Sequence, residues 1–190
     1  MAKKIPLSGV FYWLNYMLDN HWGYIFGTAG VLCTQAVIDR AANNPNNPNP
    51  ELTEKQGPKW LGHIVTDCSG VMVKIWKEYG LSVPHGSSSM VRQGYIVDCG
   101  SVPHPGWAAL IDPTPDTPDN NHIGIVSEDA QYVYEAKGTV AGFVKTKLSN
   151  SKFNKFGRFK DVDYNDEGGE DMDTPYYATS RSEERRVGKE

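Results

Sequence analysis

The feature that most restricts the fold of this chain is a change in its periodicity near residue 94. Before that point apolar residues recur at helical spacing, and over residues 8–19 they are Val10, Leu14, Met17 and Leu18. After it the chain breaks at Gly and Pro into short β-like segments, of which the best are Trp107–Ile111, His122–Val126, Gln131–Ala136 and Gly142–Leu148. Helices followed by strands, instead of regular alternation, predict the α+β class.

A tract rich in Asn and Pro, residues 43–50, divides the helical half of the chain. Proline has no amide hydrogen to donate and restricts the residue before it, so the helix predicted over residues 30–42 must end here. We predict one long surface loop over Asn43–Trp60. Long loops in compact domains are often functional, so this loop is a candidate wall of a groove.

The clearest helix opens at Thr66-Asp67-Cys68 and stops at Gly80. Its apolar positions follow in helical steps from Cys68, at Val71, Met72, Ile75, Trp76 and Tyr79. This spacing predicts that Cys68 lies in the first turn, on the buried face. Unpaired amides and the helix dipole at such a place lower the pKa of a thiol. A shorter helix is predicted over Ser87–Gln93.

Cys68 is therefore a candidate nucleophile, and its own backbone amide is a natural oxyanion donor. The residues after it, Ser69 and Gly70, are small and would let a substrate approach. A buried helical cysteine with only a packing role is the alternative. Cys33 is predicted to pack within the second helix, and Cys99 to lie in a loop or at a strand end.

The cysteine count is odd, at three, and no pair has the C-x-x-C spacing of a zinc ribbon or thioredoxin-type site. A bridge between Cys33 and Cys99 is conceivable, but free thiols fit the pattern better. No His-Glu-x-x-His segment is present, so a metal hydrolase is the least favoured class of enzyme. We expect neither a metal nor a cofactor.

A thiol nucleophile needs a base, and the chain has five histidines. His122 opens a strong strand, where alternation holds its side chain rigidly on one face. His85 and His104 neighbour prolines and are predicted to be solvated, while His63 and His21 stay open as residues near the same cleft. A structural histidine on a strand is the alternative for His122.

The base in turn needs a group that orients its far nitrogen. Residues 131–136 read as the strand after His122–Val126, joined to it by a short turn. In an antiparallel hairpin the two strands lie side by side, which places Glu135 near His122. An edge-strand charge is the alternative for Glu135.

Together these segments resemble the NlpC-type cysteine peptidases of peptidoglycan. The resemblance covers residues 8–165 and rests on Trp22–Gly27, Asp67-Cys68-Ser69-Gly70 and His122–Val126, in this order. It implies a papain-like core in which the cysteine helix packs on an antiparallel sheet. By match to the motif, Cys68 is the nucleophile and His122 the base, with Tyr24 beside the oxyanion and Asp67 and Ser69 in support. Glu135 takes a third polar position that is often histidine in the family.

What this resemblance implies is a hydrolase of amide bonds in stem peptides of bacterial peptidoglycan, at the D-γ-glutamyl to diamino acid bond. The family does not fix the preference of this chain, because the insertion at Asn43–Trp60 is unusual. Other enzymes on the same scaffold, an N-acetylmuramoyl-L-alanine amidase or an acyltransferase, stay open. So does a catalytically silent module that binds the cell wall.

Charge and hydropathy restrict the partners. A net charge of −4 and no Lys/Arg cluster argue against nucleic acid. No run approaches the roughly 18 apolar residues of a membrane span, and the N-terminal stretch lacks the marks of a secretory signal. We therefore expect a monomer made in the cytoplasm of a bacterium or phage-infected host and acting at the cell wall. The segment Phe156–Tyr164 looks like the end of phage-borne members, which favours a phage lysin.

The C-terminal part has a different composition. Residues 1–165 are the predicted peptidase domain, and residues 166–180 read as an acidic linker or tail with little to bury. The last ten residues, 181–190, look like the translation of a sequencing-adapter read, which would mean that the natural C-terminus is missing. An ordinary charged tail is the alternative. An open frame encoding this decapeptide at the natural locus would refute the adapter interpretation.

Overall fold

Helices dominate the first half of the chain and strands the second, in a computed structural model that describes residues 3–111 and 122–166. The helices are α1 (Leu7–Asp19), α2 (Gln35–Ala42), α3 (Pro50–Gln56), α4 (Gly70–Glu78) and α5 (Ser87–Arg92), with 3-10 turns η1 (Gly57–Trp60) and η2 (Leu148–Asn150). The early strands are β1 (Ile5–Pro6), β2 (Gly23–Tyr24), β3 (Ala29–Leu32) and β4 (Ile64–Thr66). The later strands are β5 (Ile96–Gly100), β6 (Ala108–Ile111), β7 (His122–Val126), β8 (Tyr132–Gly138), β9 (Gly142–Lys147), β10 (Lys155–Phe159) and β11 (Val162–Asp163).

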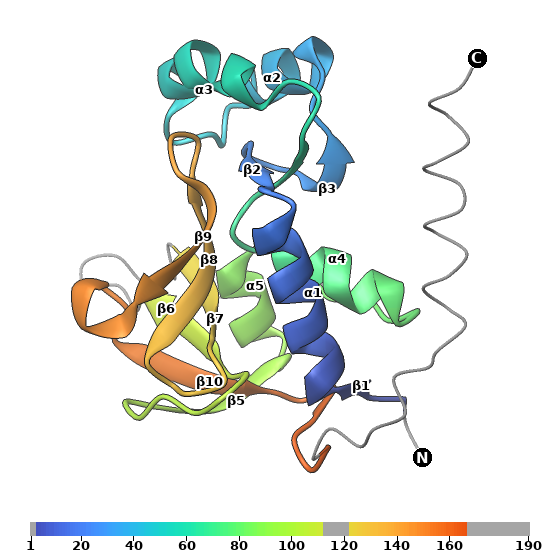
Figure 1. The fold of residues 1–190 in the computed structure, drawn as a ribbon, viewed down its shortest axis with the longest axis vertical. Coiled ribbons are helices and arrows are strands. Elements are labelled where there is room, and N and C mark those ends of the chain that lie inside the picture. Colours follow the sequence, from blue (N-terminus) through green and yellow to red (C-terminus); the bar gives the residue numbers. More distant parts are fainter. Residues whose placement is uncertain (1–2, 112–121, 167–190) are drawn as a thin grey trace.

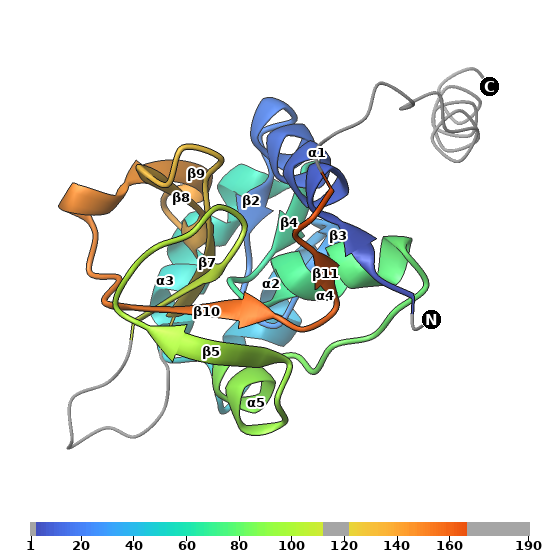
Figure 2. The ribbon, with the colours of Figure 1, turned by 90° about the horizontal axis from the view of Figure 1, so that it is seen from below.

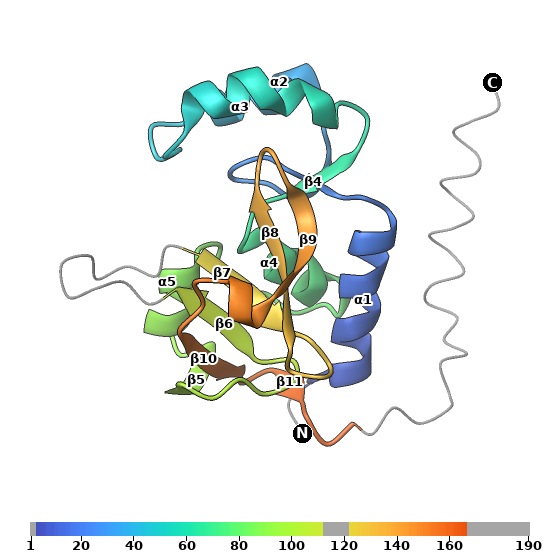
Figure 3. The ribbon, with the colours of Figure 1, turned by 60° about the vertical axis from the view of Figure 1, so that its left-hand side comes forward.

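The later strands build one antiparallel sheet in the order β5-β10-β6-β7-β8-β9. Helices α1, α4 and α5 cover one face of it (Figures 1 and 3). The core between them joins helix and strand residues, among them Leu14, Met72, Ile75, Met90, Leu110, Ile125 and Phe159, each of them 0% exposed. The predicted α+β fold, with the cysteine helix packed on an antiparallel sheet, is confirmed.

A smaller sheet, in the order β2-β4-β3, stands between the large sheet and helices α2 and α3 (Figure 1). The helix predicted over residues 30–42 is wrong in its first turn, because residues 29–32 pair with β4 as strand β3. The positive φ of Gly30, 73°, also excludes a regular helix there. Helix α2 begins instead at Gln35, after the N-cap Thr34. Cys33 lies between strand and helix, so its predicted place within the helix is wrong, although it is buried as expected.

The predicted loop over residues 43–60 contains a helix, α3, and a 3-10 turn, η1. Pro50 stands at the start of α3, where a missing amide hydrogen costs nothing, so the prolines that stop one helix permit the next. The side chain of Asn47 is buried. It donates to the carbonyl of Ala41 at 2.9 Å and to Oγ1 of Thr53 at 3.0 Å, which holds the turn between α2 and α3.

The strands predicted in the second half agree with β6, β7, β8 and β9 to within two residues at each end. Strands β5 and β10 were not predicted. In β10 a register shift between Phe156 and Arg158 interrupts the alternation of buried and exposed residues that marks a strand. Cys99 is the penultimate residue of β5 and is exposed, in agreement with a strand end. None of the three cysteines forms a disulfide.

The two ends of the described chain meet. Strand β1 pairs in parallel with β11, Ile5 opposite Val162, and Figure 2 shows both strands beside α1. Asp166, the first residue of the predicted tail, accepts a hydrogen bond from the amide of Ser8 at 3.0 Å. The rest of that tail and the predicted adapter segment lie outside the described residues. Within the described residues, no helix is long and apolar enough to cross a membrane.

Candidate active site

Cys68 lies in the turn that joins β4 to α4. Strand β4 ends at Thr66, Ser69 occupies the N-cap position, and α4 begins at Gly70. Cys68 therefore sits just before the helix, not in its first turn as predicted. A Cβ at Gly70 would lie 2.0 Å from the carbonyl oxygen of Thr28. Gly70 and Ser69 are both buried, so their small size serves the packing of this turn and not the approach of a substrate, which corrects the sequence-based expectation.

The environment of the Cys68 thiol does not favour its charged form. Burial, and after it the carboxylate of Asp67, raise the pKa of the thiol to about 12, although the backbone amides of Ile123, Ser69 and Cys68 itself oppose the shift. The sequence predicted a lowered pKa, which is wrong because the thiol is buried beside a carboxylate. Cys68 is thus a neutral thiol at rest, and it becomes a nucleophile only if a base removes its proton.

His122 is brought to this thiol by strand β7. The amide that contacts Cys68 belongs to Ile123, the residue directly after His122. The His122 ring is stacked on Phe153, with centroids 5.5 Å apart and planes at 23°. Its Nε2 lies 2.6 Å from Oε2 of Glu135. Because Glu135 engages Nε2, a proton from the thiol would have to go to Nδ1.

Strand register explains how Glu135 reaches His122. The pairing of Ile125 with Tyr134 sets Gly124 opposite Glu135, so Glu135 shares a sheet face with Gly124 and His122. A Cβ at Gly124 would lie 2.4 Å from Cγ1 of Val133 and 3.3 Å from Cβ of Glu135. The glycine between the two functional positions therefore leaves room for the carboxylate to lie diagonally across to the imidazole.

Glu135 is charged although it is buried. Burial would raise its pKa, but hydrogen bonds with His122 and Thr146, with the nearby Lys137, hold the pKa of this carboxyl below its ordinary value. Nζ of Lys137 lies 3.5 Å from Oε1, the oxygen that does not face His122. The pair therefore consists of a fixed carboxylate and an imidazole whose Nε2 donates to it.

Tyr24 is held next to the nucleophile by the small sheet. Strand β2 pairs in parallel with β4, and Tyr24 lies opposite Thr66, two residues before Cys68. Burial, and then the nearby Cys68 and Asp67, raise the pKa of the Tyr24 hydroxyl above its ordinary value. Tyr24 therefore keeps its proton at any pH at which the protein would act, and it remains a hydrogen-bond donor.

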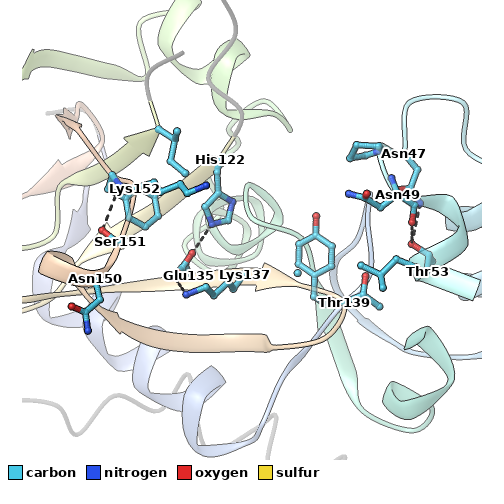
Figure 4. A pocket seen from close by; sticks show the side chains of 16 residues that line it. Asn47, Asn49, Thr53, His122, Glu135, Lys137, Thr139, Asn150, Ser151 and Lys152 are labelled. Carbon is cyan, nitrogen blue, oxygen red and sulfur yellow. Dashed lines mark hydrogen bonds and ion pairs between the residues drawn. The ribbon is translucent and has the colours of Figure 1, made fainter. Parts of the chain in front are cut away.

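A cavity of about 510 Å³ opens over this constellation (Figure 4). His122 and Glu135 line it from the large sheet, and Tyr24 lines it from β2 of the small sheet. Asn47, Asn49, Leu52 and Thr53 line it from α3 and the turn before α3. The prediction that residues 43–60 wall a groove is confirmed. Cys68 is not among the described residues that line the cavity, but it interacts with Tyr24 and with the backbone amide of Ile123, the residue after His122, and both Tyr24 and His122 line it.

The remaining predicted support residues, Asp67 and Ser69, form a hydrogen-bond network behind the nucleophile. Asp67 is 5% exposed and accepts from the amides of Gly27 at 2.8 Å and Gly70 at 2.7 Å. It also accepts from the Ser69 hydroxyl at 3.2 Å. Both residues hold the turn in place, and neither is among the described residues that line the cavity.

Sequence reasoning missed one residue of this network, His85. His85 is exposed, as predicted, but its Nε2 also lies 2.8 Å from both carboxylate oxygens of Asp67, and this contact was not predicted. A histidine between Pro and Gly carries no periodic signal, and only the fold brings residue 85 to residue 67. The other histidines stay outside the site: His21 is exposed, His63 packs against Trp60, and His104 packs against Trp107.

Within the described residues, no group of three or more His, Cys, Asp or Glu side chains could hold a metal ion. No family model matches the sequence, and a search of curated proteins found no match.

Solved structures are similar to this one. The peptidoglycan hydrolase RipB of Mycobacterium tuberculosis superposes with a TM-score of 0.51 at 15% identity, over 84% of this chain and 70% of that one. A hypothetical invasion protein of the same organism gives a TM-score of 0.52 at 14% identity, over 85% and 67% of the two chains. At such identities the likeness concerns the fold, and this chain has the α+β fold of these proteins.

Proposed function

We propose that this chain is a cysteine hydrolase that cleaves amide bonds in the stem peptides of bacterial peptidoglycan. The observation that carries the proposal is that Nε2 of His122 lies 2.6 Å from Glu135, while the amide of the next residue on the His122 strand, Ile123, contacts the Cys68 thiol. These three groups supply a nucleophile, a base and an orienting carboxylate beside a cavity that would accept a peptide. The likeness of the fold to a peptidoglycan hydrolase supports the class of substrate.

The proposed reaction starts from the neutral thiol. Nδ1 of His122 takes the Cys68 proton as Sγ attacks the carbonyl carbon, while Glu135 holds the Nε2 proton and stabilises the imidazolium. The amide of Cys68 and the hydroxyl of Tyr24 donate to the oxyanion. The C–N bond then breaks, and the leaving amine takes the proton from His122. Water, deprotonated by His122, cleaves the thioester and regenerates the thiol.

We propose the D-γ-glutamyl to diamino acid bond as the site of cleavage, and a phage lysin as the biological role. The first follows from the motif resemblance of Cys68 and His122, and the second from that of Phe156–Tyr164. An amidase or acyltransferase would share the same thiol chemistry and differ in its product. A processed N-terminus in protein exported by a host cell would contradict the phage role.

One observation favours a different class, a silent wall-binding module: the pKa of Cys68 is raised to about 12, which leaves little thiolate in the resting protein. An active enzyme must overcome this by proton transfer to His122 during attack. Alkylation of Cys68 that depends on His122 would support the enzyme, whereas a thiol inert to iodoacetamide near neutral pH would support the binder.

The proposed function predicts that purified peptidoglycan incubated with the wild-type chain releases new stem-peptide fragments, identified by mass spectrometry. Cys68→Ala should release none, since the nucleophile is absent. Cys99→Ala, at the exposed end of β5, is the matched control and should behave as wild type. The fragment masses locate the bond. Equal release by wild type and Cys68→Ala would overturn the proposal.

A further inference from the structure

Asp67 carries a buried negative charge directly beside the proposed nucleophile. Its carboxylate is 5% exposed, and it raises the pKa of both the Cys68 thiol and the Tyr24 hydroxyl. A buried carboxylate is tolerated only with hydrogen-bond donors or a counter-charge around it. The amides of Gly27 and Gly70 donate to it, but neutral donors do not cancel its charge.

The one cation within reach of that carboxylate, among the described residues, is the imidazole of His85. Its Nε2 lies 2.8 Å from Oδ1 and 2.8 Å from Oδ2 of Asp67, so a single N–H is shared between the two oxygens. The hydrogen bond to Asp67 raises the pKa of His85 above its ordinary value, although burial works in the opposite direction. The imidazolium form is therefore favoured at this position.

A second link ties the same loop to the same turn. The amide of Gly86 donates to the Ser69 hydroxyl at 3.0 Å, and that hydroxyl donates to Asp67 at 3.2 Å. The side chain of residue 85 and the backbone of residue 86 thus hold the two residues that flank Cys68. The titratable groups facing the pair are the Cys68 thiol on the same turn and the Tyr24 phenol on β2. The neutral groups beside the pair are the Ser69 hydroxyl on the turn and the Gly86 amide on the loop.

We propose that His85 is a positioning residue that acts through Asp67: as an imidazolium it neutralises the Asp67 carboxylate and fixes the turn that aims Cys68 at His122. The inference rests on the proposed function for its meaning in catalysis, but it concerns the reactivity of the thiol itself. When His85 loses its proton the hydrogen bond to Asp67 persists, while the positive charge disappears. The carboxylate then disfavours the thiolate without opposition.

The reactivity of Cys68 therefore depends on two histidines that must be in opposite protonation states. His122 must be neutral to accept the thiol proton, and His85 must be charged to offset Asp67. The advantage that His85 gives should disappear as the pH passes the raised pKa of His85.

The test measures alkylation of Cys68 by iodoacetamide as a function of pH in the full chain, from the mass of the peptide that contains Cys68. His85→Gln keeps an N–H donor for Asp67 without a charge, and His85→Lys keeps a charge to higher pH. At about pH 6.5 we expect His85→Gln to react roughly tenfold more slowly than wild type, as a one-unit rise in thiol pKa would give. His85→Lys should stay fast and extend that rate into the alkaline range. His104→Gln, an exposed histidine between prolines, should match wild type.

Superposition of the His85→Gln and wild-type profiles at all pH values would overturn the proposal. So would an equal loss in the Gln and Lys variants, because that would show a structural role with no part for the charge. Thermal melts of each variant identify a folding defect, and the Lys variant keeps the test decisive if the Gln variant is unstable. Since alkylation needs no peptidoglycan, a failed hydrolysis assay would refute the proposed function and leave this result intact.

Discussion

At the scale of single residues, the site combines a thiol whose pKa is raised with a histidine that a carboxylate already orients. Burial and Asp67 keep the proton on Cys68, whereas Glu135 is ionised and holds the far nitrogen of His122. Such a division of roles means that the rate depends on how well His122 is oriented at the moment of attack. The orienting carboxylate should therefore matter more to turnover than to substrate binding.

Glu135→Gln tests this. The amide keeps the shape but loses the charge that stabilises the His122 imidazolium, so kcat should fall by about 10–100-fold, less than the roughly 10²–10⁴-fold expected for loss of the base in His122→Ala. KM should change little. Asp98→Asn is the matched control: Asp98 lies on β5 and forms an exposed ion pair with Arg158 of β10, away from the site. A kcat for Glu135→Gln equal to wild type would rule out the orienting role.

The same carboxylate affects stability in acid. Its pKa is lowered in the folded chain, so its favourable contribution is present above its unfolded pKa of about 4.3 and is lost as the pH falls through the lower folded value. Wild type should therefore lose melting temperature in that acid range more steeply than Glu135→Gln does. Parallel melting curves against pH would show that Glu135 makes no such contribution.

At the scale of elements, α3 and the turn before it form a wall of the cavity that the large sheet alone would lack. Figure 3 shows α3 beyond the tip of the β8–β9 hairpin. Trp60 at the end of η1 anchors the wall: the indole Nε1 donates to the carbonyl of Thr139 at 2.6 Å. The ring packs directly against two glycines. A Cβ at Gly23 would lie 2.4 Å from it, and a Cβ at Gly142 would lie 2.5 Å from it. These two glycines let the aromatic ring wedge between β2 and the β8–β9 hairpin, which fixes the distance across the cavity.

If this wall contacts substrate, changes on it should alter affinity and leave the chemistry intact. Leu52 is 39% exposed and lines the cavity, so Leu52→Ala should raise KM for a stem peptide by about 5–10-fold, as loss of about 1 kcal/mol of apolar contact would. The alkylation rate of Cys68 should not change. Glu51→Ala, on the same helix with its side chain 86% exposed, is the control. An unchanged KM in Leu52→Ala would remove the wall from substrate binding.

At the scale of the whole molecule, the turn at Cys68 joins the two sheets. Strand β4 of the small sheet enters it and α4, packed on the large sheet, leaves it. Gly70 is the point of closest approach, since a Cβ there would lie 2.0 Å from the Thr28 carbonyl oxygen and 2.7 Å from Oγ1 of Thr66. Backbone cannot yield as a flexible side chain does, so this contact fixes the position of the nucleophile relative to both sheets.

Gly70→Ala should therefore destabilise the fold by about 1–3 kcal/mol through overpacking, measured as a fall in the denaturant midpoint. Gly100→Ala is the matched control, because a Cβ there meets nothing within 4 Å. Equal midpoints for the two variants would contradict the packing role of Gly70.

The sequence by itself determined the features that depend on local spacing. Local spacing suffices to place the cysteine segment, from the helical steps after Cys68, and the histidine strand, from the alternation of His122–Val126. The short turn before residues 131–136 places Glu135 beside that strand, because hairpin pairing is a local contact.

The helix within residues 43–60 was missed because three prolines hid its start, and β10 because a register shift interrupts its alternation. Only the tertiary structure decided the position of Cys68 ahead of α4, the raised pKa of its thiol and the pairing of His85 with Asp67. Burial and charge compensation depend on which distant segments meet, and no spacing along the chain encodes that.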